Sequence, residues 1–223
     1  MITAIVLAAG LSTRMGQVKQ LLPYGEHTVV EQVVSTLLAS PVDEVLVVTG
    51  HQRAAVEAAL ARWPVRTVFN PCYADQEMLA SVQAGLQAAS AGSQAALLAV
   101  GDMPAIRADV VARLVQAYRA AGDDRVFIPS YRMQAGHPVL VPRPYWPAIL
   151  ALPAGDSLRS VLHAQGACIQ WVVVDSATVL RDMDTPADYQ RELELRNQES
   201  GIRTRDPGIR NQEPDPRSLG PDS

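Results

Sequence analysis

The sequence predicts an α/β fold in which helices cover both faces of a mostly parallel sheet. Strand-like and helix-like segments alternate along the chain as far as Ser130, and parallel strands are joined by such helical crossovers. The 223 residues are 48% hydrophobic and 19% charged, which supplies enough apolar surface for a sizeable core. The same composition excludes a fibrous, collagen-like or wholly disordered chain.

The individual elements follow in order along the sequence. Short apolar runs bounded by Gly, Pro, Asn or Asp predict strands at Thr3–Ala8, Glu44–Thr49, Val65–Asn70, Ala95–Val100 and Arg125–Ile128. Apolar residues at helical spacing predict helices from the Thr28 cap to Leu38, and at Arg53–Arg62, Met78–Ala89 and Arg107–Ala120. Thr28 and Glu31 have the spacing of a capping box, which fixes the start of the first helix.

The pattern changes beyond Ser130. Gly136-His137-Pro138 leads into a strand at Val139–Val141, and the apolar run Ile169–Val174 predicts another, so we expect some antiparallel strands in this part. Thr185-Pro186-Ala187-Asp188 starts a last helix, with Thr as N-cap, Pro in the first turn and Asp at the third position. We expect this helix to run to about Arg196.

Composition divides the chain into a folded domain, residues 1–195, and a tail, residues 196–223. From Asn197 onward the sequence contains no aromatic residue and only three aliphatic ones, Ile202, Ile209 and Leu219. Such a segment buries too little apolar area to offset the entropy lost on ordering. We therefore expect a disordered tail.

Charge, hydropathy and cysteine content exclude several classes of protein. The net charge of −4 argues against a nucleic-acid binder with a broad basic patch. No apolar run approaches the roughly 18 residues of a membrane helix, and the start MITAIVLAAG lacks the basic region of a signal peptide. Cys72 and Cys168 fit no zinc or disulfide framework. We expect a cytoplasmic protein without membrane or nucleic-acid partners.

The first predicted strand runs into a loop with the composition of a phosphate site. Ligands of open α/β sheets bind at the carboxyl ends of strands, and the stretch Leu7–Lys19 lies at such an end. Two glycines permit a close backbone approach, and two cations and two hydroxyls are available to phosphate oxygens: Gly10, Gly16, Arg14, Lys19, Ser12 and Thr13. The loop has neither the GxxxxGK[ST] nor the GxGxxG pattern. The alternative is a solvated loop with incidental charges.

Lys19 stands out within this loop because it is the single lysine among 19 basic residues. Lysine is a compact point charge on a flexible stem, whereas arginine is a rigid planar fork. A chain that uses arginine almost everywhere else therefore suggests that lysine is required at this position. The alternative is that Lys19 is an ordinary surface residue.

Two further strand ends carry polar residues. Asp102 follows the apolar run Ala95–Val100, and magnesium prefers one or two carboxylates together with phosphate oxygens of a substrate. A phosphate loop beside it favours a metal site over a simple turn cap. Asp184 is a candidate second ligand, or a charge that favours the start of the last helix. His137 lies among turn residues, so it has either a polar role in a site or a bond to backbone.

These residues carry a resemblance to a known family. Leu7–Lys19 with Leu21-Leu22-Pro23 resembles the (L/T)AAGxSxRMGxxKxLLP signature of the nucleotidyltransferase superfamily. Further elements match in order, at Asn70–Tyr73, Ser81-Val82, Gly101–Pro104, Gly136–Pro138 and Asp182–Tyr189. Over about residues 1–195 the sequence is most similar to the molybdenum cofactor cytidylyltransferase and molybdopterin-guanine-dinucleotide-synthase-like NTP transferase family.

The resemblance implies a Rossmann-like three-layer α/β/α sandwich and an enzyme that transfers CMP from CTP to the phosphate of molybdopterin, releasing pyrophosphate. It implies a bound Mg²⁺, catalytic roles for Arg14, Lys19 and Asp102, and an acceptor side at His137. It implies a nucleotide site formed by Leu7, Ala8, Ala9, Gly10, Ser12, Arg14, Lys19 and Ser81. Guanine-using relatives carry glycine where this chain has Ala9, which favours CTP. A molybdoenzyme or its chaperone is the expected partner.

One departure keeps other functions open. The segment Tyr73–Ser81 is one residue longer than the usual form and lacks the glycine that many members carry before the methionine. The first alternative is a nucleotidyltransferase for another phosphorylated acceptor, either GTP:molybdopterin transfer or a sugar phosphate. The second is a non-catalytic protein that delivers a nucleotide cofactor to an apo-enzyme.

Overall fold

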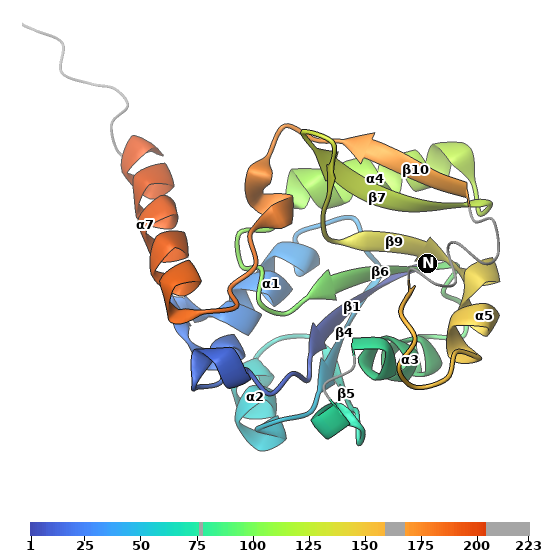
Figure 1. The fold of residues 1–223 in the computed structure, drawn as a ribbon. Coiled ribbons are helices and arrows are strands. Elements are labelled where there is room, and N and C mark those ends of the chain that lie inside the picture. Colours follow the sequence, from blue (N-terminus) through green and yellow to red (C-terminus); the bar gives the residue numbers. More distant parts are fainter. Residues whose placement is uncertain (76–77, 159–167, 204–223) are drawn as a thin grey trace, which may run out of the picture.

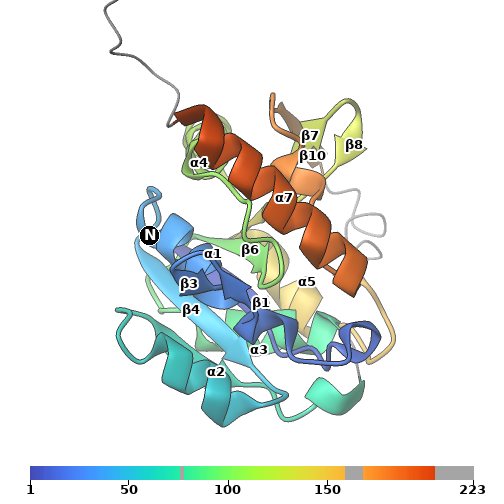
Figure 2. The same cartoon turned by 90° about the vertical axis from the view of Figure 1, so that its left-hand side faces the viewer.

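A computed structural model describes residues 1–75, 78–158 and 168–203. Its main sheet has the strand order β10-β7-β9-β6-β1-β4-β5, with β8 paired to β7 (Figures 1 and 2). The strands are β1 Ile2–Ala8, β4 Glu44–Thr49, β5 Arg66–Phe69, β6 Ala95–Val100, β7 Arg125–Tyr131, β8 Gln134–Ala135, β9 Val139–Pro142 and β10 Cys168–Val173. The predicted strands are therefore present within a few residues of their expected bounds.

The sheet is mostly parallel, as the sequence predicts. β1 pairs in parallel with β4 and β6, β4 with β5, and β7 with β10. β9 is antiparallel to both β6 and β7, and β8 is antiparallel to β7. These pairings confirm the antiparallel strands expected in the later part of the chain. The physical reason is that the short turns from β7 to β8 and β9 leave no room for the helical crossover that parallel neighbours need.

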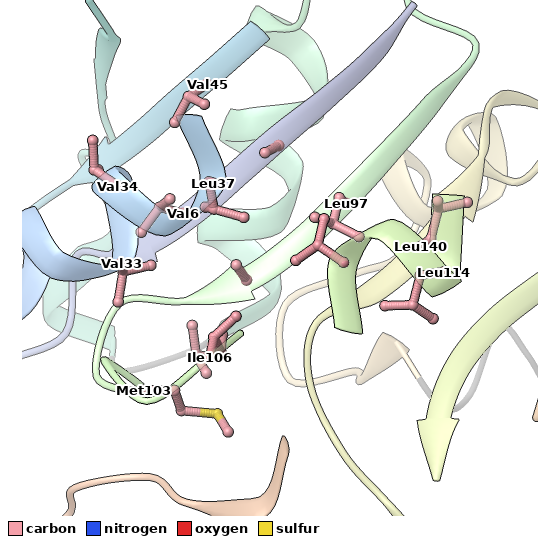
Figure 3. Close-up of a cluster of buried hydrophobic side chains, with 14 of the residues drawn as sticks. Val6, Val33, Val34, Leu37, Val45, Leu97, Met103, Ile106, Leu114 and Leu140 are labelled. Carbon is pink, nitrogen blue, oxygen red and sulfur yellow. The ribbon is translucent and has the colours of Figure 1, made fainter. Parts of the chain in front are cut away.

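Helices cover both faces of the sheet and make a three-layer sandwich. One core cluster joins α1 Val29–Leu38, α2 Arg53–Leu60 and α4 Ala108–Ala121 to the sheet, and Figure 3 shows part of it. The other face packs against α3 Met78–Ala88 and the short helix α5 Trp146–Leu150. Every residue of β6 is buried, in agreement with its unbroken apolar sequence AALLAV.

Local sequence signals fix the helix starts. The Thr28 hydroxyl accepts the backbone N–H of Glu31, and the Glu31 carboxylate accepts the backbone N–H of Thr28 at 2.8 Å, so the predicted capping box is confirmed. Thr185 and Asp188 form the same reciprocal pair at the start of α7, Pro186–Arg203. α7 continues past the expected end at Arg196 to Arg203, so residues 196–203, which were expected to belong to the disordered tail, are helical.

α7 lies on the side of the molecule to which the carboxyl ends of the parallel strands point (Figure 1). A small cluster of buried side chains joins the segment just before α7 to the first loop and to the β2–β3 hairpin, whose strands are Pro23–Tyr24 and His27–Thr28. The members of this cluster are Met15, Leu22, Tyr24, Val29 and Met183. No helix of the described residues is long and apolar enough to cross a membrane. Residues 204–223 of the expected tail lie outside the described part of the chain.

Candidate active site

A cavity of about 530 Å³ opens at the carboxyl ends of β1 and β6. Its walls come from the first loop, the end of β6, the turn at residues 135–137 and the segment 179–184. These parts lie far apart in the sequence, and parallel strands bring them to one edge of the sheet. The cavity therefore lies where the sequence places its candidate ligand residues.

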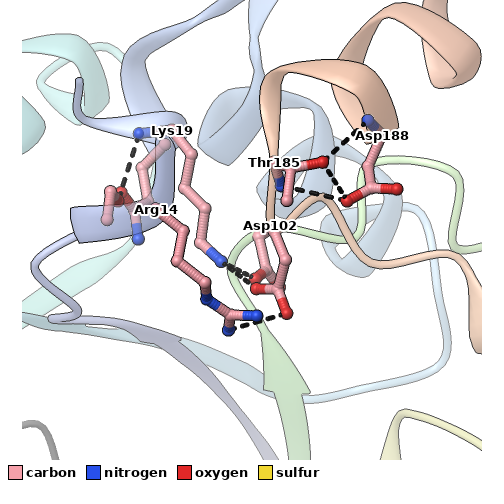
Figure 4. Close-up of polar contacts among 8 residues, drawn as sticks. Arg14, Lys19, Asp102, Thr185 and Asp188 are labelled. Atoms are coloured by element: carbon pink, nitrogen blue, oxygen red, sulfur yellow. Dashed lines mark hydrogen bonds and ion pairs between the residues drawn. The ribbon is translucent and has the colours of Figure 1, made fainter. Parts of the chain in front are cut away.

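Lys19 is at the centre of the charged groups in this cavity (Figure 4). Its ammonium forms an ion pair with Asp102 and contacts Asp184 Oδ1 at 3.0 Å. Arg14 Nη2 contacts the other oxygen of Asp184 at 2.9 Å. The Lys19 and Asp102 side chains are only 13% and 14% exposed, whereas Arg14 is 69% exposed. The structure thus brings together all four residues predicted for catalysis and metal binding.

The two carboxylates keep Lys19 charged. Burial disfavours the ammonium, but ion pairs with Asp102 and Asp184 outweigh that effect and raise the pKa of Lys19 above its ordinary value. The side chain of a surface lysine is solvated, whereas that of Lys19 is largely buried between the two carboxylates. The geometry therefore excludes the interpretation of Lys19 as an ordinary surface residue.

Hydrogen bonds inside the first loop fix the backbone of Lys19. The Ser12 hydroxyl accepts the backbone N–H of Lys19 at 3.3 Å and donates to the side chain of Gln20 at 3.2 Å. Ser12 adopts a left-handed backbone conformation. The short helix Thr13–Met15 follows it, and the Met15 side chain is buried in the small cluster near α7. Ser12 lines the cavity as expected, but its hydroxyl is engaged within the loop.

The Asp-Met-Asp sequence before α7 positions two carboxylates at once. Met183 is completely buried, while Asp182 and Asp184 on either side of it line the cavity. An apolar anchor between two acidic residues turns both toward the same space. Sequence analysis singled out Asp184 but not Asp182, although this alternation was the signal that was available for it.

The remaining nucleotide-site residues divide by location. Leu7, Ala9, Gly10 and Ser81 line the cavity. Ala8 instead packs in the hydrophobic core with its side chain almost fully buried, because successive residues of β1 point to opposite faces of the sheet. Unlike its neighbours, Ala8 therefore does not line the cavity.

The loop after β5 forms another wall of the cavity. Asn70 is buried; its side-chain oxygen accepts the N–H of Cys72 at 2.9 Å, and its amide donates to Ser81 at 3.0 Å. This places the Tyr73 ring at the cavity. A Cβ on Gly50 would lie 2.5 Å from the Cβ of Tyr73 and 2.6 Å from the carbonyl oxygen of Ala9, so glycine is required there for close packing.

His137 faces the cavity from the other side. Its backbone N–H donates to the Val179 carbonyl at 2.9 Å, and in the part of the chain that the structure describes its buried Nδ1 has no hydrogen-bond partner. Burial lowers the pKa of His137, although the charges of Asp102 and Asp182 act in the opposite direction. The imidazole is therefore neutral at pH 7, with a polar atom left for a ligand.

The residues present fit a divalent cation that arrives with a phosphate ligand. Within the described ranges no group of three or more His, Cys, Asp or Glu side chains is placed to hold a metal ion. Asp102 and Asp184 offer hard carboxylate oxygens to the same space, and Asp102 Oδ1 is buried without a hydrogen-bond partner among the described residues. Mg²⁺ is commonly held by one or two carboxylates plus substrate phosphates. Two protein ligands are thus sufficient for such a cation.

Comparison with solved structures places this architecture among nucleotidyltransferases. A nucleotidyl transferase from Methanothermobacter matches with a TM-score of 0.77 and 30% identity, covering 88% of this chain and 99% of the other. A protein from Mycobacterium tuberculosis H37Rv, solved in complex with manganese, matches with a TM-score of 0.73 and 27% identity, covering 86% and 98%. The fold is therefore that of a nucleotidyltransferase.

Sequence comparison then gives the family. The chain belongs to the MobA-like NTP transferase family, whose domain model matches residues 4–169. The molybdenum cofactor cytidylyltransferase of Escherichia coli K12 is 30% identical over 84% of this chain and 93% of its own. The nicotine blue oxidoreductase of Paenarthrobacter nicotinovorans is 29% identical over 86% of this chain and 96% of its own.

Proposed function

We propose that this protein transfers CMP from CTP to the terminal phosphate of a molybdopterin-type acceptor and releases pyrophosphate, in a reaction that depends on Mg²⁺. The observation that carries the proposal is the convergence of Lys19, Arg14, Asp102 and Asp184 at one edge of the sheet. The relative from Escherichia coli, which matches 84% of this chain, supports the choice of nucleotide and acceptor.

The charges of the cavity suit an in-line displacement at phosphorus. An oxygen of the acceptor phosphate attacks the α-phosphorus of the NTP, the bond to the β-phosphate oxygen breaks, and pyrophosphate leaves. The attacking phosphate is already ionised, so no strong general base is needed. Catalysis then consists of positioning and of neutralising charge, which Lys19 and Arg14 supply to the triphosphate.

The charge balance of the cavity favours a metal requirement. Arg14 and Lys19 contribute +2, and Asp102, Asp182 and Asp184 contribute −3, so the charged lining residues sum to −1. A triphosphate entering alone meets net repulsion. Asp102 and Asp184 would hold a divalent cation, which neutralises the charge that develops on the phosphates. The manganese complex of the Mycobacterium tuberculosis relative agrees with this requirement.

Ala9 supports the choice of CTP over GTP. Its methyl group faces Gly50, and the Tyr73 side chain packs against the same position. A glycine in place of Ala9 would leave more room beside the nucleobase, so the filled position favours a pyrimidine. One methyl group discriminates by about 1–3 kcal/mol, and we therefore expect some residual use of GTP.

The acceptor side of the site combines the His137 imidazole, within range of the Asp102 and Asp182 charges, with apolar neighbours. His137 offers a buried Nδ1, while Ala135, Val179 and Leu180 line the same part of the cavity. A neutral imidazole is able to hydrogen-bond a phosphate or a ring heteroatom without adding charge. We infer that the acceptor enters here, and that a cytoplasmic molybdoenzyme or its chaperone receives the product.

A matrix of the four NTPs against molybdopterin and sugar phosphates tests the proposal, with pyrophosphate release as the readout. We expect release with CTP and molybdopterin in the presence of Mg²⁺. Higher kcat/KM with GTP, or release only with a sugar phosphate, would assign a different transferase. Nucleotide binding without pyrophosphate release in any pair would indicate a delivery protein. A redox assay without NTP tests the chemistry that the name of the Paenarthrobacter relative suggests.

A further inference from the structure

The ammonium of Lys19 lies where the proposed cation would lie. It contacts one oxygen of Asp102 and one oxygen of Asp184, the two carboxylates that fit a divalent metal. We propose that Lys19 fills the cation position in the nucleotide-free protein and leaves it when a metal–triphosphate complex enters. Metal and nucleotide then bind together, and metal alone binds weakly. This inference rests on the proposed metal role of the two carboxylates.

One position cannot hold both cations. A divalent ion bound to Asp102 and Asp184 would lie about 2.0–2.1 Å from their oxygens. Lys19 Nζ already contacts Asp184 Oδ1 at 3.0 Å and pairs with Asp102. A metal in that position meets the ammonium at close range, and like charges in a partly buried site repel strongly. Binding of the metal therefore requires the Lys19 side chain to move.

The structure permits that movement without a change in the backbone. The Ser12 hydroxyl and the Leu22 amide hold the main chain of Lys19, and Gln20 beside it is buried. Four flexible methylene groups separate this fixed backbone from the ammonium. A triphosphate in the cavity offers Lys19 a denser negative charge than the carboxylates do. When the Lys19 ammonium moves to the triphosphate, the carboxylate oxygens that it contacted become available to the metal, beside the unpartnered Oδ1 of Asp102.

Arg14 provides the internal contrast. Among the described residues its mostly exposed side chain forms an ion pair with Asp184 and none with Asp102. Loss of Arg14 removes one positive charge from the same site but does not vacate the position between the carboxylates. The contrast also explains why the single lysine of the chain stands at position 19. A planar guanidinium there would hold the carboxylate oxygens in a bidentate fork and would move less readily from the carboxylates to the triphosphate.

Equilibrium binding of Mn²⁺ tests the proposal without any nucleobase or acceptor. Protein-bound Mn²⁺ is measured by equilibrium dialysis, with and without tripolyphosphate in both compartments so that chelation by the free polyphosphate is the same on each side, for the parent protein, Lys19→Met and Arg14→Met. We expect Lys19→Met to bind Mn²⁺ alone about 10-fold more tightly than the parent, and Arg14→Met to change less than about 3-fold. Tripolyphosphate should tighten Mn²⁺ binding about 10-fold in the parent and much less in Lys19→Met. Lys19→Gln replaces Lys19→Met if the latter does not fold.

The single lysine allows the movement itself to be observed. Selective ¹⁵Nζ-lysine labelling gives one side-chain ammonium resonance, because Lys19 is the only lysine of the chain. Mg²⁺ with tripolyphosphate should shift this resonance to a second position that Mg²⁺ alone, at the same concentration, does not populate. An unchanged resonance, or equal Mn²⁺ affinity of Lys19→Met and the parent, would overturn the proposal. Coupled binding without pyrophosphate release in the NTP matrix would instead contradict the transferase proposal alone.

Discussion

Glu192→Gln should destabilise the protein through one buried ion pair. The Glu192 carboxylate accepts hydrogen bonds from the Tyr24 hydroxyl at 2.9 Å and from Arg181 Nε and Nη2 at 2.8 and 2.7 Å. Its side chain is 4% exposed. These contacts connect α7 to the segment before it and to the β2–β3 hairpin. Burial and the neighbouring carboxylate raise the pKa of Tyr24, so its hydroxyl remains a donor.

The magnitude follows from the burial of the pair. Glutamine has the same shape, but its amide group places a donor against Arg181 and leaves the guanidinium without a full counter-charge. Removing one member of a buried pair costs about 3–5 kcal/mol. Domains of this size shift their melting temperature by about 2–4 °C per kcal/mol, so we expect a decrease of roughly 6–20 °C. The loss of about 3–5 kcal/mol is a large part of a typical unfolding free energy of about 5–15 kcal/mol.

Glu199→Gln is the matched control, because Glu199 contacts the same arginine from solvent. Its carboxylate accepts from Arg181 Nη1 at 3.1 Å, but its side chain is 64% exposed. Exposed pairs of this kind contribute about 0–1 kcal/mol. Thermal and urea unfolding of both variants by circular dichroism measures the difference. If the two variants melt within about 2 °C of each other, the reasoning from burial is refuted.

Three further predictions concern the site and the chain end. Asp102→Asn should lower Mg²⁺-dependent pyrophosphate release by about 10²–10³-fold. The control Asp109→Asn, which removes an exposed ion pair with Arg107, should leave the rate unchanged. Equal rates of Asp102→Asn and the parent would exclude the metal role. Because burial lowers the pKa of His137 in the folded state, the unfolded chain takes up its proton first as the pH falls, so the free energy of unfolding should decrease below about pH 6.5. Urea titrations should show that His137→Gln reduces this slope, and an unchanged slope would contradict it. Deletion of residues 204–223 should leave melting temperature and turnover unchanged, since their composition supports no core; a marked loss of either would assign that segment a role.

The sequence by itself determined the longer elements and their order, because these depend on neighbours in the chain. The apolar runs of β1, β4 and β6 are long enough and sharply enough bounded to specify buried strands. Capping boxes at Thr28 and Thr185 need only residues three positions apart. The candidate residues of the first loop were also recognisable from their spacing.

Local signals were too weak for several other features. The short helix α5 has only five residues and begins Trp-Pro, which gives no helical period to detect. α7 extends to Arg203 where its sequence is almost wholly polar, and contacts such as that of Glu199 with Arg181 accompany the extension. Ala8 is the last residue of β1 and Ala9 follows it, and their different surroundings depend on which side of the sheet each side chain faces, where both sides are covered by apolar residues.

Only the tertiary structure decided how the site is assembled. Lys19 and Asp184 are 165 residues apart in the chain, yet their charged atoms lie at 3.0 Å. No periodicity relates such residues; the parallel sheet brings Lys19 and Asp102 to one edge, and the buried Met183 turns Asp184 toward them. The sequence therefore identified the charged groups, while the fold decided that one lysine lies between two carboxylates, because that arrangement depends on packing between distant segments.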